Sequence, residues 1–143
     1  MKYLTNTLLA LVLIGCCDDC VPWDLFRFKL VTPDHSDYLL ENGLTIEDVE
    51  LFTVLQNTDT IYINNLESDF VTSEPNIMVA RITENFEKIY FEIQGQVKDS
   101  ITLNLNVVRS NPCCASITTI KSVEYKNQTT DFERLSLIEI IIE

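Results

Sequence analysis

Apolar and polar residues alternate along most of the chain that follows the N-terminal segment. The clearest case is ITLNLNVV at 101–108, in which every second side chain up to Val107 is apolar. Alternation with a period of two indicates a β-strand with one buried face. The same pattern occurs in LFRFKL at 25–30 and in KIYFEI at 88–93, and the β-branched run LIEIIIE closes the sequence at 137–143. We expect each of these segments to form a strand.

Four further segments show a weaker strand pattern. They are VELFTVL at 49–55, TIYINNL at 60–66, IMVARI at 77–82 and SITTIKSVEY at 116–125. Turn-forming stretches such as TPDHSD, QNTD, TSEPN, GQVKD, RSNP and KNQTTD separate the expected strands. One helical turn is compatible with TIEDVELF at 45–52, where Thr45 and Asp48 are spaced to cap it. About eight short strands predict an all-β fold, an antiparallel two-sheet β-sandwich (immunoglobulin-like) over residues 23–143.

Length and composition indicate a single domain with a sizeable core, and the net charge excludes one class of partner. The 143 residues correspond to one domain, and a hydrophobic content of 46% is enough for a sizeable core. Acidic residues number 22 against 10 basic ones, which gives a formal net charge of -12. Nucleic-acid phosphates repel such a chain, and no basic patch offsets the repulsion. We therefore expect no nucleic-acid partner.

The first fifteen residues have the layout of a secretion signal. Lys2 supplies a positive charge, and the apolar run LLALVLI at 8–14 is too short to span a bilayer. The sequence LIGC at 13–16 resembles the lipobox of bacterial lipoproteins. The resemblance implies a signal peptide at 1–15 and a lipidated Cys16 that holds the protein on a membrane. The alternative is an ordinary cleaved signal with a free or paired Cys16.

Acidic residues follow the expected anchor. In CDDC, Asp18 and Asp19 resemble the export signal of Bacteroidetes-type lipoproteins, whereas Cys17 departs from that pattern. The resemblance implies an acidic tether at 16–22 and a location on the outer membrane, at the cell surface. A periplasmic location is the alternative, since any soluble linker can be acidic.

Two longer segments, FKLVTPDHSDYLL at 28–40 and ITLNLNVVRSNPCCASITTIKSVEY at 101–125, lie in the expected mature chain. In these segments the chain resembles small Bacteroidetes lipoproteins of unknown function. His35 stands in the turn where such proteins often carry glycine. The resemblance supports location and fold, and it implies no activity.

The remaining cysteines are expected to form disulfides, because an exported protein meets oxidising conditions. A bond between the adjacent Cys113 and Cys114 is geometrically poor. We favour a link from Cys20 to Cys113 or Cys114, with a Cys17–Cys20 bond or free thiols as alternatives. A four-thiolate zinc site would need a second spaced pair in place of the adjacent one. We therefore expect no metal and no cofactor.

Catalytic motifs are missing from the sequence. His35 is the only histidine, and although it could be drawn into a triad with a serine and Asp37, no nucleophile-elbow motif accompanies it. Carboxylates are scattered, with no pair that suggests a glycosidase. Asp34, Ser36 and Asp37 could bind calcium, but capping of the turn is the simpler role for them. These observations predict a protein that is not an enzyme.

Outward aromatic residues are the remaining candidates for a binding surface. Tyr62 and Tyr90 fall opposite the core residues of their strands, and Trp23 begins the first strand. On one sheet they would form a platform for a sugar or a protein partner, although cross-strand aromatic pairs also occur simply to stabilise sheets. We expect a lipid-anchored, non-enzymatic binding or accessory module. The rival classes are a carbohydrate-active or other extracytoplasmic enzyme, and a structural envelope subunit that exchanges a strand through the apolar segment 138–143.

Overall fold

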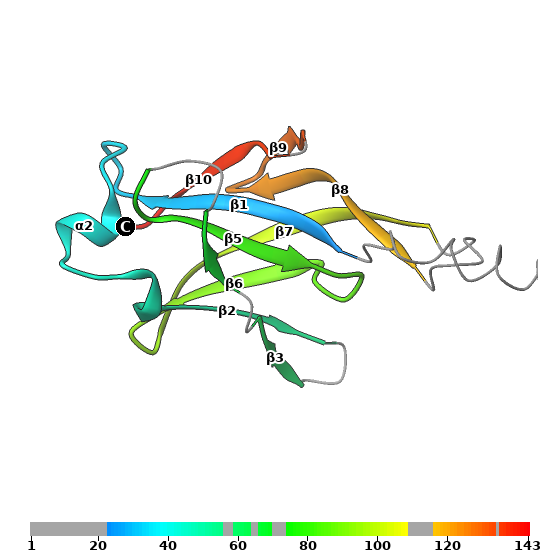
Figure 1. Ribbon diagram of the computed structural model, residues 1–143, viewed down its shortest axis with the longest axis horizontal. Coiled ribbons are helices and arrows are strands. Elements are labelled where there is room, and N and C mark those ends of the chain that lie inside the picture. Colours follow the sequence, from blue (N-terminus) through cyan, green and yellow to red (C-terminus); the bar gives the residue numbers. More distant parts are fainter. Residues whose placement is uncertain (1–22, 56–58, 64–65, 70–73, 109–115, 134) are drawn as a thin grey trace, which may run out of the picture.

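The computed structural model describes residues 23–55, 59–63, 66–69, 74–108, 116–133 and 135–143. Its strands are β1 (Asp24–Val31), β2 (Val49–Val54), β3 (Thr60–Tyr62), β4 (Glu67–Ser68), β5 (Ile77–Ile82), β6 (Lys88–Ile93), β7 (Gln96–Val108), β8 (Ile117–Tyr125), β9 (Gln128–Asp131) and β10 (Leu137–Ile141). A short helix α2 (Tyr38–Glu41) and a 3₁₀ turn η1 (Ile46–Asp48) lie between β1 and β2 (Figure 1).

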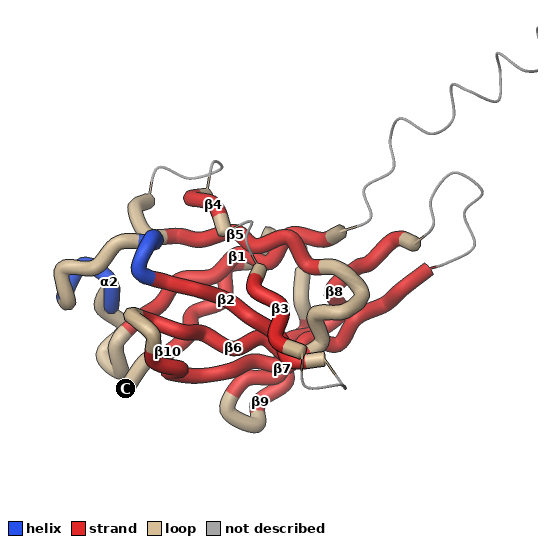
Figure 2. The backbone as a smooth tube through the Cα atoms, turned by 90° about the horizontal axis from the view of Figure 1, so that it is seen from below, coloured by secondary structure: helices blue, strands red, loops and turns tan. Residues whose placement is uncertain are grey.

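The described strands form two sheets packed as layers (Figure 2). The smaller sheet has the order β10-β1-β5-β4, and the larger has the order β3-β2-β6-β7-β8-β9. All neighbours are antiparallel except β1 and β10, which run parallel. The expected all-β sandwich is confirmed. It resembles immunoglobulin domains in having two packed sheets, but its strands follow a different order within the sheets.

Side chains of both sheets meet in one core. Phe28 stacks on Phe26 with ring centroids 5.4 Å apart and meets Phe91 of the other sheet edge-on at 5.3 Å. Aromatic pairs in these geometries stabilise a core beyond the area that they bury. The alternation in 101–108 is confirmed over its first half, since Leu103 is 2% exposed and Asn104 is exposed. The strand register shifts after Asn104, and the next apolar residues are only partly buried.

Two stretches expected as turns are largely strand. The chain reverses at Gln94 and Gly95, so β7 already begins at Gln96, within the expected turn GQVKD. It reverses again at Lys126 and Asn127, and the rest of KNQTTD forms β9. In both reversals the two central residues have positive φ, as in a two-residue hairpin. These tight turns leave more residues for the strands, and β4 and β9 are additions to the expected eight.

The carboxylate of Asp37 stabilises the segment between β1 and α2 through three contacts. It accepts the Leu40 amide at 3.0 Å, which caps α2, and it pairs with Lys29 at 3.3 Å and Asn76 at 3.2 Å. Burial acts most strongly on this carboxylate and raises its pKa. The Leu40 amide, Asn76 and Lys29 together outweigh burial, and the net result is a lowered pKa for Asp37.

We expect Asp37→Asn to lower the free energy of unfolding at neutral pH and to have little effect in acid. The folded-state pKa of Asp37 lies below its ordinary value, so its contribution is present above that ordinary value and is lost as pH falls through the lowered one. Asparagine still caps a helix but cannot pair with Lys29. Asp37→Ala removes the cap as well, at a further cost of about 0.5–2 kcal/mol.

Urea denaturation at pH 7 and at pH 3 checks this prediction. The difference in unfolding free energy between the parent and Asp37→Asn should shrink toward the lower pH. A difference that is the same at both values would show that the Asp37 charge does not contribute.

Arg27 is the one charged residue of β1 that the fold buries. The alternation places it on the face opposite Phe26 and Phe28, yet it is only 7% exposed. Its guanidinium pairs with Asp69 at 2.6 Å and also donates to the carbonyl of Leu135. The contact ties the segment before β10 to the middle of β1.

Candidate functional site

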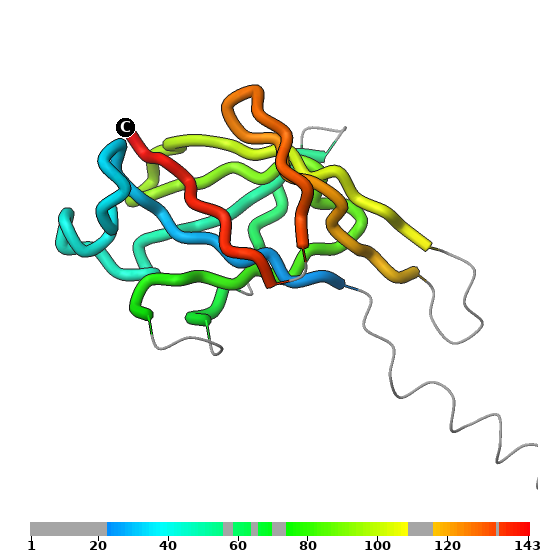
Figure 3. The backbone as a smooth tube through the Cα atoms, turned by 90° about the horizontal axis from the view of Figure 1, so that it is seen from above, coloured from blue at the N-terminus to red at the C-terminus, as the bar shows by residue number. Residues whose placement is uncertain are grey.

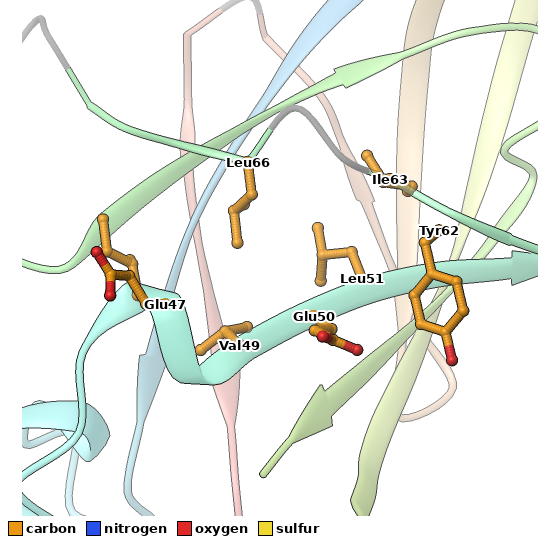
Figure 4. A pocket seen from close by; sticks show the side chains of 8 residues that line it. Glu47, Val49, Glu50, Leu51, Tyr62, Ile63 and Leu66 are labelled. Atoms are coloured by element: carbon orange, nitrogen blue, oxygen red, sulfur yellow. The ribbon is translucent and has the colours of Figure 1, made fainter. Parts of the chain in front are cut away.

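A pocket of 520 Å³ opens where the chain passes from the larger sheet to the smaller one. Its lining comes from η1, β2, the end of β3 and the start of the segment that enters β4. The lining residues are Ile46, Glu47, Val49, Glu50, Leu51, Tyr62, Ile63 and Leu66. Leu51 and Leu66 point toward one another across the opening (Figure 4). The floor is apolar because Val49, Leu51 and Ile63 also belong to the core.

Carboxylates stand beside this apolar floor. Glu47 and Glu50 line the pocket, and Glu50 lies directly opposite Glu92 in the pairing of β2 with β6. Like charges directly opposite one another in a sheet are destabilising. A positive charge from a bound molecule would relieve the repulsion between Glu50 and Glu92.

Tyr62 and Tyr90 lie in one row across the outer face of the larger sheet. Phe52 of β2 stands between them and is paired with Tyr62 on one side and with Tyr90 on the other. The rings of Phe52 and Tyr90 are 5.0 Å apart with an interplanar angle of 12°, and the Lys88 ammonium lies 5.1 Å from the Tyr90 ring. The Phe52 and Tyr90 rings therefore turn faces toward each other. Tyr62, 47% exposed, ends the row and borders the pocket.

Trp23 lies apart from the two tyrosines. It precedes β1 in the smaller sheet, and its ring lies 5.0 Å from the guanidinium carbon of Arg81. The structure therefore brings together Tyr62 and Tyr90 and places Trp23 on the other layer. A platform made of all three residues does not form.

The contacts made by the turn around His35 stabilise the fold. His35 adopts a positive φ of 65°, the conformation that glycine tolerates best, and its ring contacts Glu139 at 2.8 Å. The Thr32 hydroxyl, which donates to Asp34, has the largest part in lowering the pKa of that carboxyl. Asp37 caps α2. In the described part of the chain no three metal-binding side chains lie together.

The expected lipid anchor and the cysteines lie outside the described residues. Cys16, Cys17, Cys20, Cys113 and Cys114 all fall in segments 1–22 and 109–115. Lipidation and disulfide pairing therefore remain predictions. Within the residues that the structure describes, no helix has the length and apolar character needed to cross a bilayer.

Sequence reasoning missed Phe52 and the opposed pair Glu50 and Glu92. Alternation in VELFTVL already places Phe52 outward, between the inward Leu51 and Thr53, so this signal was present. The pairing of Glu50 with Glu92 depends on the register of β2 against β6, and no local pattern fixes that register.

Comparison of the chain with known protein families, with curated proteins and with solved structures found no match. The geometry itself defines the class. The chain is a β-sandwich protein with a pocket whose floor is apolar and whose lining includes Glu47 and Glu50.

Proposed function

We propose that the chain is a lipid-anchored lipoprotein of the cell envelope whose sandwich is a non-enzymatic binding or accessory module. The lipobox-like LIGC at 13–16 supports an anchor at Cys16, and Asp18 and Asp19 support display on the outer membrane. β1 begins at Asp24, eight residues after Cys16 in the sequence. Such an anchor would hold the sandwich close to the membrane surface.

The observation that carries the binding role is the pocket with an apolar floor, whose lining includes Glu50, the residue opposite Glu92 in the sheet. Binding sites are typically concave and apolar, with a few polar groups that orient the ligand. The 520 Å³ opening is concave and has an apolar floor that includes Leu51, with Tyr62 at its border. Glu47 and Glu50 are the acidic residues of its lining.

The chemistry of the site favours a ligand with an apolar group next to a positive charge. The apolar group would enter between Leu51 and Leu66, and the positive charge would lie near Glu50 and Glu92. A partner protein that presents a basic side chain beside a large apolar one has this chemistry. Attraction between such a partner and a chain of net charge -12 would also speed their encounter.

The enzyme alternative would use Glu50 and Glu92 as paired acids. A glycosidase places its two carboxylates on either side of the bond that it cleaves. Glu50 and Glu92 project from neighbouring strands on one open face of the sheet, and only Glu50 lines the pocket. This placement weighs against catalysis and in favour of charge recognition.

We expect Tyr62→Ala to weaken binding about tenfold, which corresponds to about 1.4 kcal/mol, because Tyr62 borders the pocket. Tyr90→Ala is the matched control, since Tyr90 belongs to the same aromatic row but does not line the pocket. Its effect should stay within about twofold, or about 0.4 kcal/mol. Isothermal titration uses three probes: a hexapeptide containing Lys-Phe, its Glu-Phe counterpart, and a neutral hexasaccharide.

The proposal predicts binding of the Lys-Phe peptide alone. Equal losses for the two tyrosine variants would assign binding to the aromatic row and not to the pocket. Binding of the hexasaccharide in place of the peptides would favour a glycan ligand, and turnover of that sugar would establish the enzyme alternative.

A further inference from the structure

At the side away from the pocket, the described part of the smaller sheet does not cover the last strand of the larger sheet. β9 ends the larger sheet there, and β10 ends the smaller one (Figure 3). In the pairing of β8 with β9, Thr130 lies opposite the buried Val123, so Thr130 faces the interior side of its sheet. Thr130 is nevertheless exposed. Among the described strands, none of the smaller sheet covers the inner face of β9.

β10 presents an open edge toward this uncovered face. The amide of Ile142 donates to Val31 of β1 at 2.8 Å. Because backbone groups point alternately to the two sides of a strand, those of Leu137, Glu139 and Ile141 point away from β1. The carbonyl of Ile141 is consistent with this direction, since it accepts a hydrogen bond from the Tyr125 hydroxyl of β8 at 2.8 Å. In the described part of the sheet no strand pairs with this edge of β10.

A groove of 260 Å³ lies between β10 and the inner face of β8 and β9. Val123 and Ile138 contribute apolar surface from the two sheets, and Gln128 and Thr130 contribute polar surface from β9. Leu137, which is 38% exposed, stands at the border. An apolar groove next to free backbone donors and acceptors is what an added strand requires.

We propose that this groove accepts an extended segment of another protein, which pairs with Leu137 and Glu139 and becomes the fifth strand of the smaller sheet. Alternate side chains of the segment would cover Val123 and Thr130. The side chains between them would lie on the outer face, beside Glu139. This surface is distinct from the pocket, which lies at the β2–β3 side of the larger sheet.

The negative charge beside the open edge of β10 favours a segment with basic residues. Glu139 projects outward beside the open edge with its side chain 45% exposed, and the chain carries a net charge of -12. A segment with lysine or arginine opposite Glu139 is attracted to this edge. A second copy of the chain would bring a further charge of -12, and strong like charge keeps proteins apart.

The experiment uses the full chain in detergent micelles and a displayed library of nine-residue peptides with lysine fixed at the centre. A twin library carries glutamate there. Thr130→Trp fills the groove. Thr129→Trp is its matched control, because Thr129 is also exposed, lies on the same strand, and pairs with the exposed Glu124 on the outer face. Circular dichroism melting verifies that both variants fold.

We expect the lysine library to be enriched at least tenfold over the glutamate library. Peptides selected on the parent should lose at least tenfold in affinity for Thr130→Trp and stay within twofold for Thr129→Trp. Their binding should also slow hydrogen exchange of the Glu139 amide at least tenfold, a readout that needs no variant.

Four results would overturn the proposal. They are no enrichment of the lysine library, equal affinities for the two variants, a dimer that Thr130→Trp dissociates, and peptide binding that appears only after residues 1–22 are removed. The third would identify a second copy as the occupant, and the fourth would identify the chain's own N-terminal segment.

Discussion

Cys16→Ser releases the protein from membranes and abolishes its labelling with a fatty acid: this is the largest effect that we expect. Each buried methylene of an acyl chain contributes about 0.8 kcal/mol to membrane binding, so loss of the lipid removes the anchoring free energy almost entirely. Cys17→Ser is the matched control, since it changes the neighbouring thiol and leaves LIGC at 13–16 intact.

Fractionation of cells that express the parent and the two variants measures the effect. The parent and Cys17→Ser should sediment with membranes, and Cys16→Ser should remain in the supernatant. If Cys16→Ser sediments like the parent, LIGC is not a lipobox. Digestion of intact cells with protease tests surface display in the parent, and protection until the outer membrane is broken would place the protein in the periplasm.

The second large effect concerns the core. Leu103 is 2% exposed within the core cluster, and truncation of a buried leucine to alanine typically costs about 2–5 kcal/mol. That is a large share of the roughly 5–15 kcal/mol that stabilises a domain. Asn104→Ala, at an exposed position on the opposite face of β7, should change stability by no more than about 0.5 kcal/mol.

Equilibrium denaturation of a form without residues 1–16 compares the two variants with the parent. Leu105→Ala should fall between them, because Leu105 lies beyond the register shift in β7 and is only partly buried. Comparable losses for Leu103→Ala and Asn104→Ala would contradict a strand with one buried face at this position.

The strands with one buried face could be predicted because their pattern is local. In β1 and β6 the apolar residues alternate with charged or polar ones, and burial in the core enforces this alternation. β9 escaped prediction because QTTD is polar on both faces and all four of its residues are exposed. The start of β7 was misplaced because a two-residue reversal at Gln94 and Gly95 uses far less of the chain than the turn stretch suggested.

The candidate site depends on pairings that the sequence does not display. The row of Tyr62, Phe52 and Tyr90 requires β3, β2 and β6 to be neighbours in one register. Alternation predicted the outward direction of the two tyrosines but could not place Trp23 on the other layer. The pocket forms between Leu51 and Leu66, where the chain changes sheet, and such a tertiary arrangement has no periodic signal.

The most direct test of the central claim is amide chemical-shift mapping during titration with the Lys-Phe hexapeptide. We predict that the largest shifts occur at Glu47, Glu50, Leu51 and Ile63, around the pocket. Shifts confined to Tyr90 and Lys88, or spread evenly over the surface, would contradict the claim that this pocket beside Glu50 and Glu92 is the binding site.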